Sequence, residues 1–174
     1  INLIHELDSL RFICGEVRRV YAQSSSAVRK FEVEDSLTIS LSFESGAVGS
    51  ILASDATPSP WSYEATTHEN PYYYPTDENC YYFLGTLGSL AFPRMELWRY
   101  ADGDKSGWHF PMRMSRNIVD RADPLTTQLE HFCRVIKGEE RPIVDGRDGT
   151  RSLSVVLAVL ESIQREAPVV LAES

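Results

Sequence analysis

A histidine and an aspartate near the start of the chain are one helical turn apart and have side chains that suit acid–base chemistry. His5 precedes Asp8 by three residues in the stretch INLIHELDSL. An imidazole titrates near neutrality and a carboxylate one turn away can set its protonation, so the pair fits a general acid or base. The alternative is a polar residue at a helix start beside an ordinary solvated carboxylate, and an i, i+3 pair by itself favours that alternative.

The aromatic segment 57–79 is the second candidate region. It contains four prolines and no hydrophobic period, and so long a loop without secondary structure of its own is usually functional or disordered. Its aromatic content disfavours disorder. Rings with polar tips suit a pocket for a sugar-like ligand, whereas a surface loop packed on its own rings, or an oligomer contact, explains them equally well. The residues concerned are Trp61, His68, Tyr72, Tyr73 and Tyr74.

Several common site patterns are absent from the sequence. No G-x-G-x-x-G follows a predicted strand, so we do not expect the chain to bind a dinucleotide by itself in the usual way. There is no G-x-S-x-G elbow, no H-E-x-x-H pair and no paired-cysteine zinc pattern. The four histidines are scattered, so the sequence predicts no metal site.

Composition and charge narrow the class of protein. The 174 residues are 43% hydrophobic and 24% charged, as in one ordinary domain with its own core. The net charge of −8 is spread over mixed acidic and basic residues, which argues against nucleic-acid or membrane partners and favours small neutral or weakly charged ones. Three widely spaced cysteines suit reduced core thiols, and no apolar run approaches the roughly 18 residues of a membrane span, so we expect a cytoplasmic protein.

The opening helix must position the histidine. Its leucines recur at i, i+4 and i+7 and are expected to face a core, with Gly15 as the stop. Asn2, His5 and Asp8 step along a different face, which is polar. A functional site is expected on that polar face.

Strands are predicted to follow this helix. Segments 16–25 and 36–43 have strand character, and the second alternates strictly between apolar and polar residues. A turn at Gly46 predicts an antiparallel hairpin with 47–54. Strand character resumes over 80–100, where glycines mark tight turns.

Two helices are predicted to close the chain. Asp123 is the expected cap of a helix with an apolar stripe that ends at Gly138, and 149–166 is apolar over a wider arc and is expected to be well buried. A helix, antiparallel strands and two further helices indicate an α+β fold, in which an open, mainly antiparallel sheet has helices packed on one face. The Ser/Thr face of the sheet is left for solvent or another subunit.

Four ordered blocks of the sequence resemble a known family. Residues 1–22, 43–56, 83–100 and 123–165 together are similar to the C-terminal domain of the Gfo/Idh/MocA oxidoreductases, the glucose-fructose oxidoreductase and inositol dehydrogenase family. The resemblance implies that 1–174 forms a substrate-binding and oligomerisation domain like the C-terminal domain of dihydrodipicolinate reductase. It also implies homodimers or homotetramers built through the open sheet face.

The resemblance further implies an NAD(P)-dependent oxidoreductase. In that family an N-terminal Rossmann domain binds NAD or NADP, and this domain is expected to be absent from the chain, so the fragment alone is expected to be inactive. Hydride would move between the nicotinamide and a hydroxyl or carbonyl of a sugar, cyclitol or similar small molecule. A non-catalytic ligand-binding or assembly domain of the same fold is the alternative.

The resemblance also assigns roles to residues. His5 falls at the family's histidine, which exchanges a proton with the substrate hydroxyl, and Asp8 matches the acidic position after it. Many members have an aspartate four residues before that histidine, where this sequence has Ile1, and Asn2 supplies a polar group one residue later. The residues expected to bind substrate are Asn2, Asp8, Trp61, His68 and Tyr73.

Overall fold

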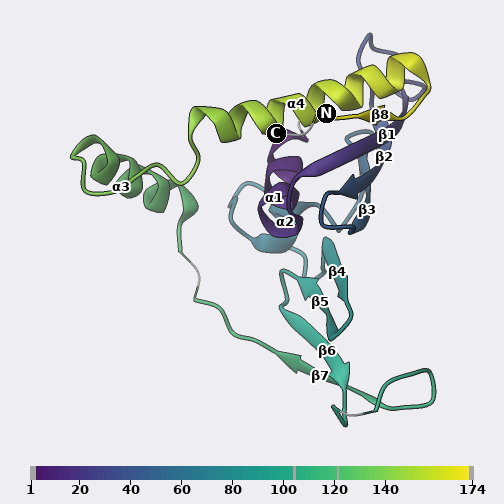
Figure 1. Cartoon of the computed structure of the whole chain (residues 1–174), viewed down its shortest axis with the longest axis vertical. Helices are drawn as coiled ribbons and strands as arrows, with labels where there is room; N and C mark the ends of the chain where they lie inside the picture. Colours follow the sequence, from purple (N-terminus) through teal and green to yellow (C-terminus); the bar gives the residue numbers. More distant parts are fainter. Residues whose placement is uncertain (1–2, 104, 121, 173–174) are drawn as a thin grey trace. The chain divides into compact units, whose positions relative to one another are not determined.

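The computed structural model describes residues 3–103, 105–120 and 122–172 (Figure 1). The chain divides into two compact units, one formed by Ile1–Pro58 with Pro142–Ser174 and the other by Ser59–Arg141. Each unit contains a four-stranded antiparallel sheet. The α+β class is confirmed, and the strands are shared between two sheets.

The first unit combines two helices with one sheet, whose strand order is β3-β2-β1-β8. Its elements, in chain order, are α1 (Ile4–Cys14), β1 (Val17–Ser25), β2 (Ser36–Phe43), β3 (Val48–Ser54), α4 (Gly146–Arg165) and β8 (Val169–Val170). The helix α4 lies along this sheet and packs against β1 (Figure 1). The hairpin predicted around Gly46 is confirmed by the antiparallel register of β2 and β3.

The core of the first unit lies between one face of the sheet and the two helices. The alternating residues Leu37, Ile39, Leu41 and Phe43 of β2 are all buried, as the sequence predicted. Leu7 of α1 is also buried, and Gly15, with φ of +91°, ends this helix as predicted. Burial of these apolar side chains fixes α1 on the sheet, so the polar face of α1 points elsewhere.

One face of α4 packs on the sheet and another remains exposed. Val155, Ala158 and Val159 are buried, whereas Leu153 and Leu157 are 48% and 55% exposed. The prediction of a well-buried helix is therefore correct for one face and wrong for the other. A single sheet covers only part of the circumference of a helix that is apolar over a wide arc.

The second unit contains the other sheet, with strand order β4-β5-β6-β7. Its elements are α2 (Tyr63–Thr67), β4 (Tyr81–Gly85), β5 (Gly88–Phe92), β6 (Glu96–Tyr100), β7 (Met112–Arg116) and α3 (Pro124–Ile136). A Cβ at Gly88 would lie 2.6 Å from the carbonyl oxygen of Trp98, which explains the glycine at this predicted turn. The strand β7 was not predicted, since Met112–Arg116 has no β-branched or aromatic residue.

The segment 57–79 is not free of secondary structure, so that expectation is wrong. The Oγ of Ser62 accepts a hydrogen bond from Ala65 N and caps α2, which spans only five residues. A helix this short does not repeat long enough to produce a hydrophobic period.

The helix α3 has the predicted cap, because the Asp123 carboxylate accepts a hydrogen bond from Leu125 N. None of its described residues is buried, and Cys133 is exposed. The expectation of a core thiol is thus wrong for Cys133. Within the described residues, no helix combines the length and the apolar character needed to cross a membrane.

Candidate functional site

His5 lies in the first turn of α1, and its side chain is exposed. The side chain of Asp8 is one turn further along the same helix and 40% exposed. Among the hydrogen bonds of the described residues, none joins His5 to Asp8. The imidazole is therefore accessible to a small molecule, and the aspartate has other partners.

The carboxylate of Asp8 is held by the helix α4. Its Oδ1 accepts a hydrogen bond from Ser152 Oγ and lies 3.5 Å from Nη1 of Arg11. Ser152 is buried on the sheet side of α4. Because the contact crosses from α1 to α4, it fixes both the side chain of Asp8 and the rotation of α1 about its axis.

Arg11 is the centre of this polar cluster, and only 5% of its surface is exposed. Its Nε and Nη2 donate to the two carboxylate oxygens of Glu16 at 2.9 and 2.8 Å. Nη2 also donates to Asp148 Oδ1 at 2.9 Å, and Nη1 donates to Ser152 Oγ at 2.6 Å. A buried guanidinium needs such partners on every edge, since an unpaired one would be costly.

The charges of the cluster reinforce one another. The hydrogen bond from Arg11 holds the pKa of Glu16 below its ordinary value, and the same contact raises the pKa of Arg11. Burial raises the pKa of the Cys14 thiol at the end of the helix. The ion pair between Arg11 and Glu16 therefore remains fully charged near neutrality.

Two clefts border this part of the first unit. One has a volume of about 360 Å³ and lies over the polar cluster, with Asp8, Arg11, Glu16 and Asp148 in its wall beside exposed apolar residues such as Phe12. The other, of about 250 Å³, is apolar and lies between α1, β2 and α4. His5 is in the wall of neither cleft.

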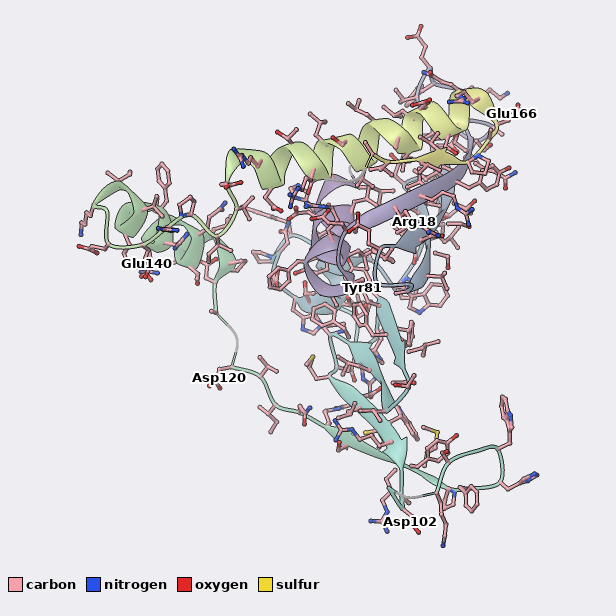
Figure 2. The ribbon with its side chains drawn as sticks, in the orientation of Figure 1. Arg18, Tyr81, Asp102, Asp120, Glu140 and Glu166 are labelled. Carbon is pink, nitrogen blue, oxygen red and sulfur yellow. The ribbon has the colours of Figure 1, made fainter. Side chains whose placement is uncertain are left out.

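The aromatic segment 57–79 is held by a ring contact with β5 and by a contact of its own. The ring of Tyr63 stacks on Phe92, and Tyr81 stacks on the same ring at a centroid distance of 5.8 Å. Tyr81 is labelled in Figure 2, at the start of β4. His68 adopts a left-handed conformation with Nε2 3.0 Å from the carbonyl oxygen of Thr76. These contacts make the segment a folded platform.

The predicted substrate-binding residues of this segment are on its surface. Trp61 is 60% and Tyr73 is 50% exposed, and His68 is exposed as well. No hydrogen bond or ring contact of the described residues joins Trp61, His68 and Tyr73 to one another. They belong to the second unit, whereas His5 and Asp8 belong to the first. Asn2 lies outside the described residues.

Sequence reasoning missed the polar cluster of Arg11, Glu16, Asp148 and Ser152. A signal was present, because Arg11 stands four residues after Leu7 and so on the apolar face of the helix. An arginine at such a position requires buried acceptors. Its partners could not be predicted from the sequence, since Ser152 is 141 positions away along the chain.

The described residues form neither a cluster of metal ligands nor a dinucleotide-binding turn. No three His, Cys, Asp or Glu side chains of the described part of the chain gather as metal ligands. Both sheets are antiparallel, whereas a dinucleotide fold places its glycine-rich turn between a parallel strand and a helix. The described residues thus do not fit a dinucleotide cradle of their own.

Comparison with known proteins identifies relatives of this domain. The family described as "Oxidoreductase family, C-terminal alpha/beta domain" matches residues 1–171. Among curated proteins none matches the chain.

Solved structures share the fold over nearly the whole chain. One is the WlbA dehydrogenase from Bordetella pertussis in complex with NADH and UDP-GlcNAcA. It is 22% identical to this chain in sequence with a TM-score of 0.67, and the match covers 99% of this chain and 44% of the WlbA chain. A levoglucosan dehydrogenase in complex with NADH and levoglucosan is 18% identical to this chain with a TM-score of 0.67. The match covers 99% of this chain and 50% of that dehydrogenase chain. An Agrobacterium radiobacter oxidoreductase in complex with NAD+, L-tartaric acid and magnesium is 22% identical to this chain with a TM-score of 0.65. The match covers 98% of this chain and 48% of that oxidoreductase chain. The chain spans about half the length of these structures.

Proposed function

Because this chain belongs to the Gfo/Idh/MocA oxidoreductase family through its C-terminal α/β domain, we propose that it is the substrate-binding and oligomerisation domain of an NAD(P)-dependent dehydrogenase. The substrate would be a sugar, cyclitol or similar hydroxylated molecule. The solved relatives that contain NADH together with UDP-GlcNAcA or levoglucosan support this class. A Rossmann domain elsewhere in the complete protein would hold NAD or NADP, since the chain spans about half of those relatives.

The observation that carries the proposal is the accessible imidazole of His5 on the first turn of α1. A bound nicotinamide supplies hydride acceptance or donation. In alcohol oxidation His5 would accept the hydroxyl proton of the substrate at a ring nitrogen, and in carbonyl reduction it would return that proton. Because the hydroxyl must lose its proton as the hydride leaves, a positioned acceptor of that proton accelerates formation of the carbonyl.

The other candidate residues would bind and orient. Asp8, held through Oδ1 by Ser152, would direct its second oxygen toward His5 or a substrate hydroxyl. Asn2 would add a polar group at the start of the same helix. Within the second unit, Trp61, His68 and Tyr73 would each offer aromatic and polar surface to a sugar ring, and their exposure supports this role.

A second copy of the chain is the proposed partner of the open sheet face in the first unit. Val48 and Leu52 on this face of β3 are 81% and 82% exposed beside the polar residues Thr38 and Ser40. Such a mixed surface suits a homodimer or homotetramer. We place the complete protein in the cytoplasm, because none of the three cysteines of this chain forms a disulfide.

The test uses the complete protein and follows nicotinamide absorbance with glucose, myo-inositol and levoglucosan as substrates. His5→Ala should lower kcat by about 10²–10⁴-fold, the usual contribution of a positioned acid or base. His109→Ala is the matched control, since His109 is exposed in the second unit, and it should keep full activity. Full turnover by His5→Ala would refute the proton-transfer role.

A domain that binds ligand or assembles without turnover is the second candidate function. The sequence departs from many family members at one position, where Ile1 replaces an aspartate, so a His–Asp relay of the inositol dehydrogenase type is not expected. A wild-type protein that binds these compounds in calorimetry but does not change nicotinamide absorbance would establish this second function.

A further inference from the structure

We propose that Ser152 is a positioning residue, which acts on the chemistry at His5 by fixing the carboxylate of Asp8. The inference rests on the proposed function, because it takes α1 to carry the acid–base residue. It assigns to a serine of α4 a role that the sequence does not indicate.

The direction of the hydrogen bonds follows from the chemistry of the three side chains. A guanidinium only donates, so the Oγ of Ser152 must accept from Nη1 of Arg11, at 2.6 Å. The single hydroxyl hydrogen of Ser152 is then free to point at Oδ1 of Asp8, which as a carboxylate oxygen only accepts. The three residues therefore form a one-way relay from Arg11 through Ser152 to Asp8.

The relay runs from the interior of the first unit to its surface. The side chain of Arg11 and the residue Ser152 are each 3% exposed, whereas the side chain of Asp8 is 40% exposed. A hydroxyl that accepts from a charged donor becomes a stronger donor itself, and low exposure increases this effect. The strengthened donor is the Ser152 hydroxyl, and it acts on Asp8, the one side chain of the three that is accessible to a substrate.

Arg11 cannot turn away from Ser152, because its other donors are also engaged. Glu16 binds Nε and Nη2, and Asp148 accepts from Nη2 with its carboxylate and from Nη1 with its carbonyl oxygen. Contacts from both the α1–β1 connection and the start of α4 set the plane of the guanidinium. The position of the Ser152 hydroxyl is therefore determined by three separate segments of the chain.

The consequence concerns the second oxygen of Asp8. With Oδ1 engaged by Ser152, rotation of the carboxylate is restricted, and Oδ2 has a fixed direction on the helix face that also carries His5. Loss of the hydroxyl would leave Oδ1 only its long 3.5 Å contact with Nη1 of Arg11 and so loosen this rotation, and catalysis is sensitive to small losses of orientation. The effect should fall on kcat, because the bulk of the substrate would still be bound by other residues.

The experiment is a double-mutant cycle in the complete protein, with the substrate among glucose, myo-inositol and levoglucosan that the wild type oxidises. Ser152→Ala should lower kcat about 5- to 20-fold and leave KM within about twofold. In an Asp8→Asn background the same change should have no further effect on kcat. Ser154→Ala is the matched control, because Ser154 is exposed on the same helix and donates only to the carbonyl oxygen of Thr150.

The possible results separate the two proposals. A kcat of Ser152→Ala within twofold of wild type, or an equal fall in both backgrounds, overturns the positioning role while leaving His5 in place. An inactive wild type overturns the proposed function and this inference together. If Ser152→Ala does not fold, Ser152→Cys keeps the volume with a much weaker donor, and its kcat is judged by the same criteria.

Discussion

The hydroxyl of Ser162 near the end of α4 accepts a hydrogen bond from the backbone amide of Ala22 in β1, at 2.9 Å. The same hydroxyl donates to the carbonyl oxygen of Ala167 at 2.7 Å, and Ser162 has no exposed surface. One buried side chain thus satisfies two backbone groups of different segments.

Replacing Ser162 by Ala should therefore destabilise the first unit by about 1–3 kcal/mol, the usual cost of unsatisfied buried polar groups. Urea unfolding monitored by circular dichroism measures this change. Ser154→Ala removes a hydroxyl from the exposed side of the same helix and should shift the free energy of unfolding by no more than about 0.5 kcal/mol. Equal effects of the two substitutions would contradict the role assigned to Ser162.

Arg11→Met should be among the most damaging single changes in the first unit. It leaves the carboxylates of Glu16 and Asp148 without their buried partner, and breaking a buried ion pair costs about 3–5 kcal/mol. Arg151→Met is the control, since the side chain of Arg151 is 46% exposed and its Nη1 makes a long contact of 3.4 Å with Glu16. This substitution should lower the free energy of unfolding by less than about 1 kcal/mol. If Arg11→Met also lowered the free energy of unfolding by less than about 1 kcal/mol, the cluster would not be structurally important.

The stability of the domain should decrease in acid partly through Glu16. Its folded-state pKa lies below the ordinary value of 4.5, so the ion pair stabilises the fold above that pH. The stabilisation is lost as the pH falls through the lower, folded-state value. The thermal midpoint of Glu16→Gln should be lower than wild type near neutrality and should change less between about pH 5 and pH 3. Parallel curves for the two proteins would exclude this contribution.

Trp61 should contribute to substrate binding and not to the chemical step. Trp61→Ala in the complete protein is expected to raise KM about 5- to 20-fold and to leave kcat within about twofold, because an aromatic wall acts on bound substrate and transition state alike. Trp108→Ala removes a fully exposed indole from the same unit and should leave both constants unchanged. An unchanged KM in Trp61→Ala would remove this residue from the proposed site.

Local patterns were enough to predict much of the fold. The alternation of β2, the glycine after α1 and the Asp123 cap of α3 each depend on neighbours in the sequence, and each prediction is confirmed. The strand β7 has no such local signal and is formed by pairing with β6. Long-range pairing decides such segments, and a single sequence does not record it.

The candidate site was predictable only in its exposed part. His5 and Asp8 were found because their types and spacing suggest chemistry, and their roles remain predictions. The partners that hold Asp8 come from α4, whose hydrogen bond to this residue spans 144 positions. Propensity and periodicity do not report which distant serine faces a given aspartate, so Ser152 required the structure.

The division of the chain into two units has a consequence for its synthesis. The whole of Ser59–Arg141 is inserted between the two parts of the first unit. While a ribosome synthesises this insertion, α4 and β8 have not yet emerged. The apolar surface of α1 and the edge of β1 that they cover later therefore stay exposed. The first unit can therefore complete its fold only after the second unit has been synthesised, and until then its apolar surface is open to aggregation.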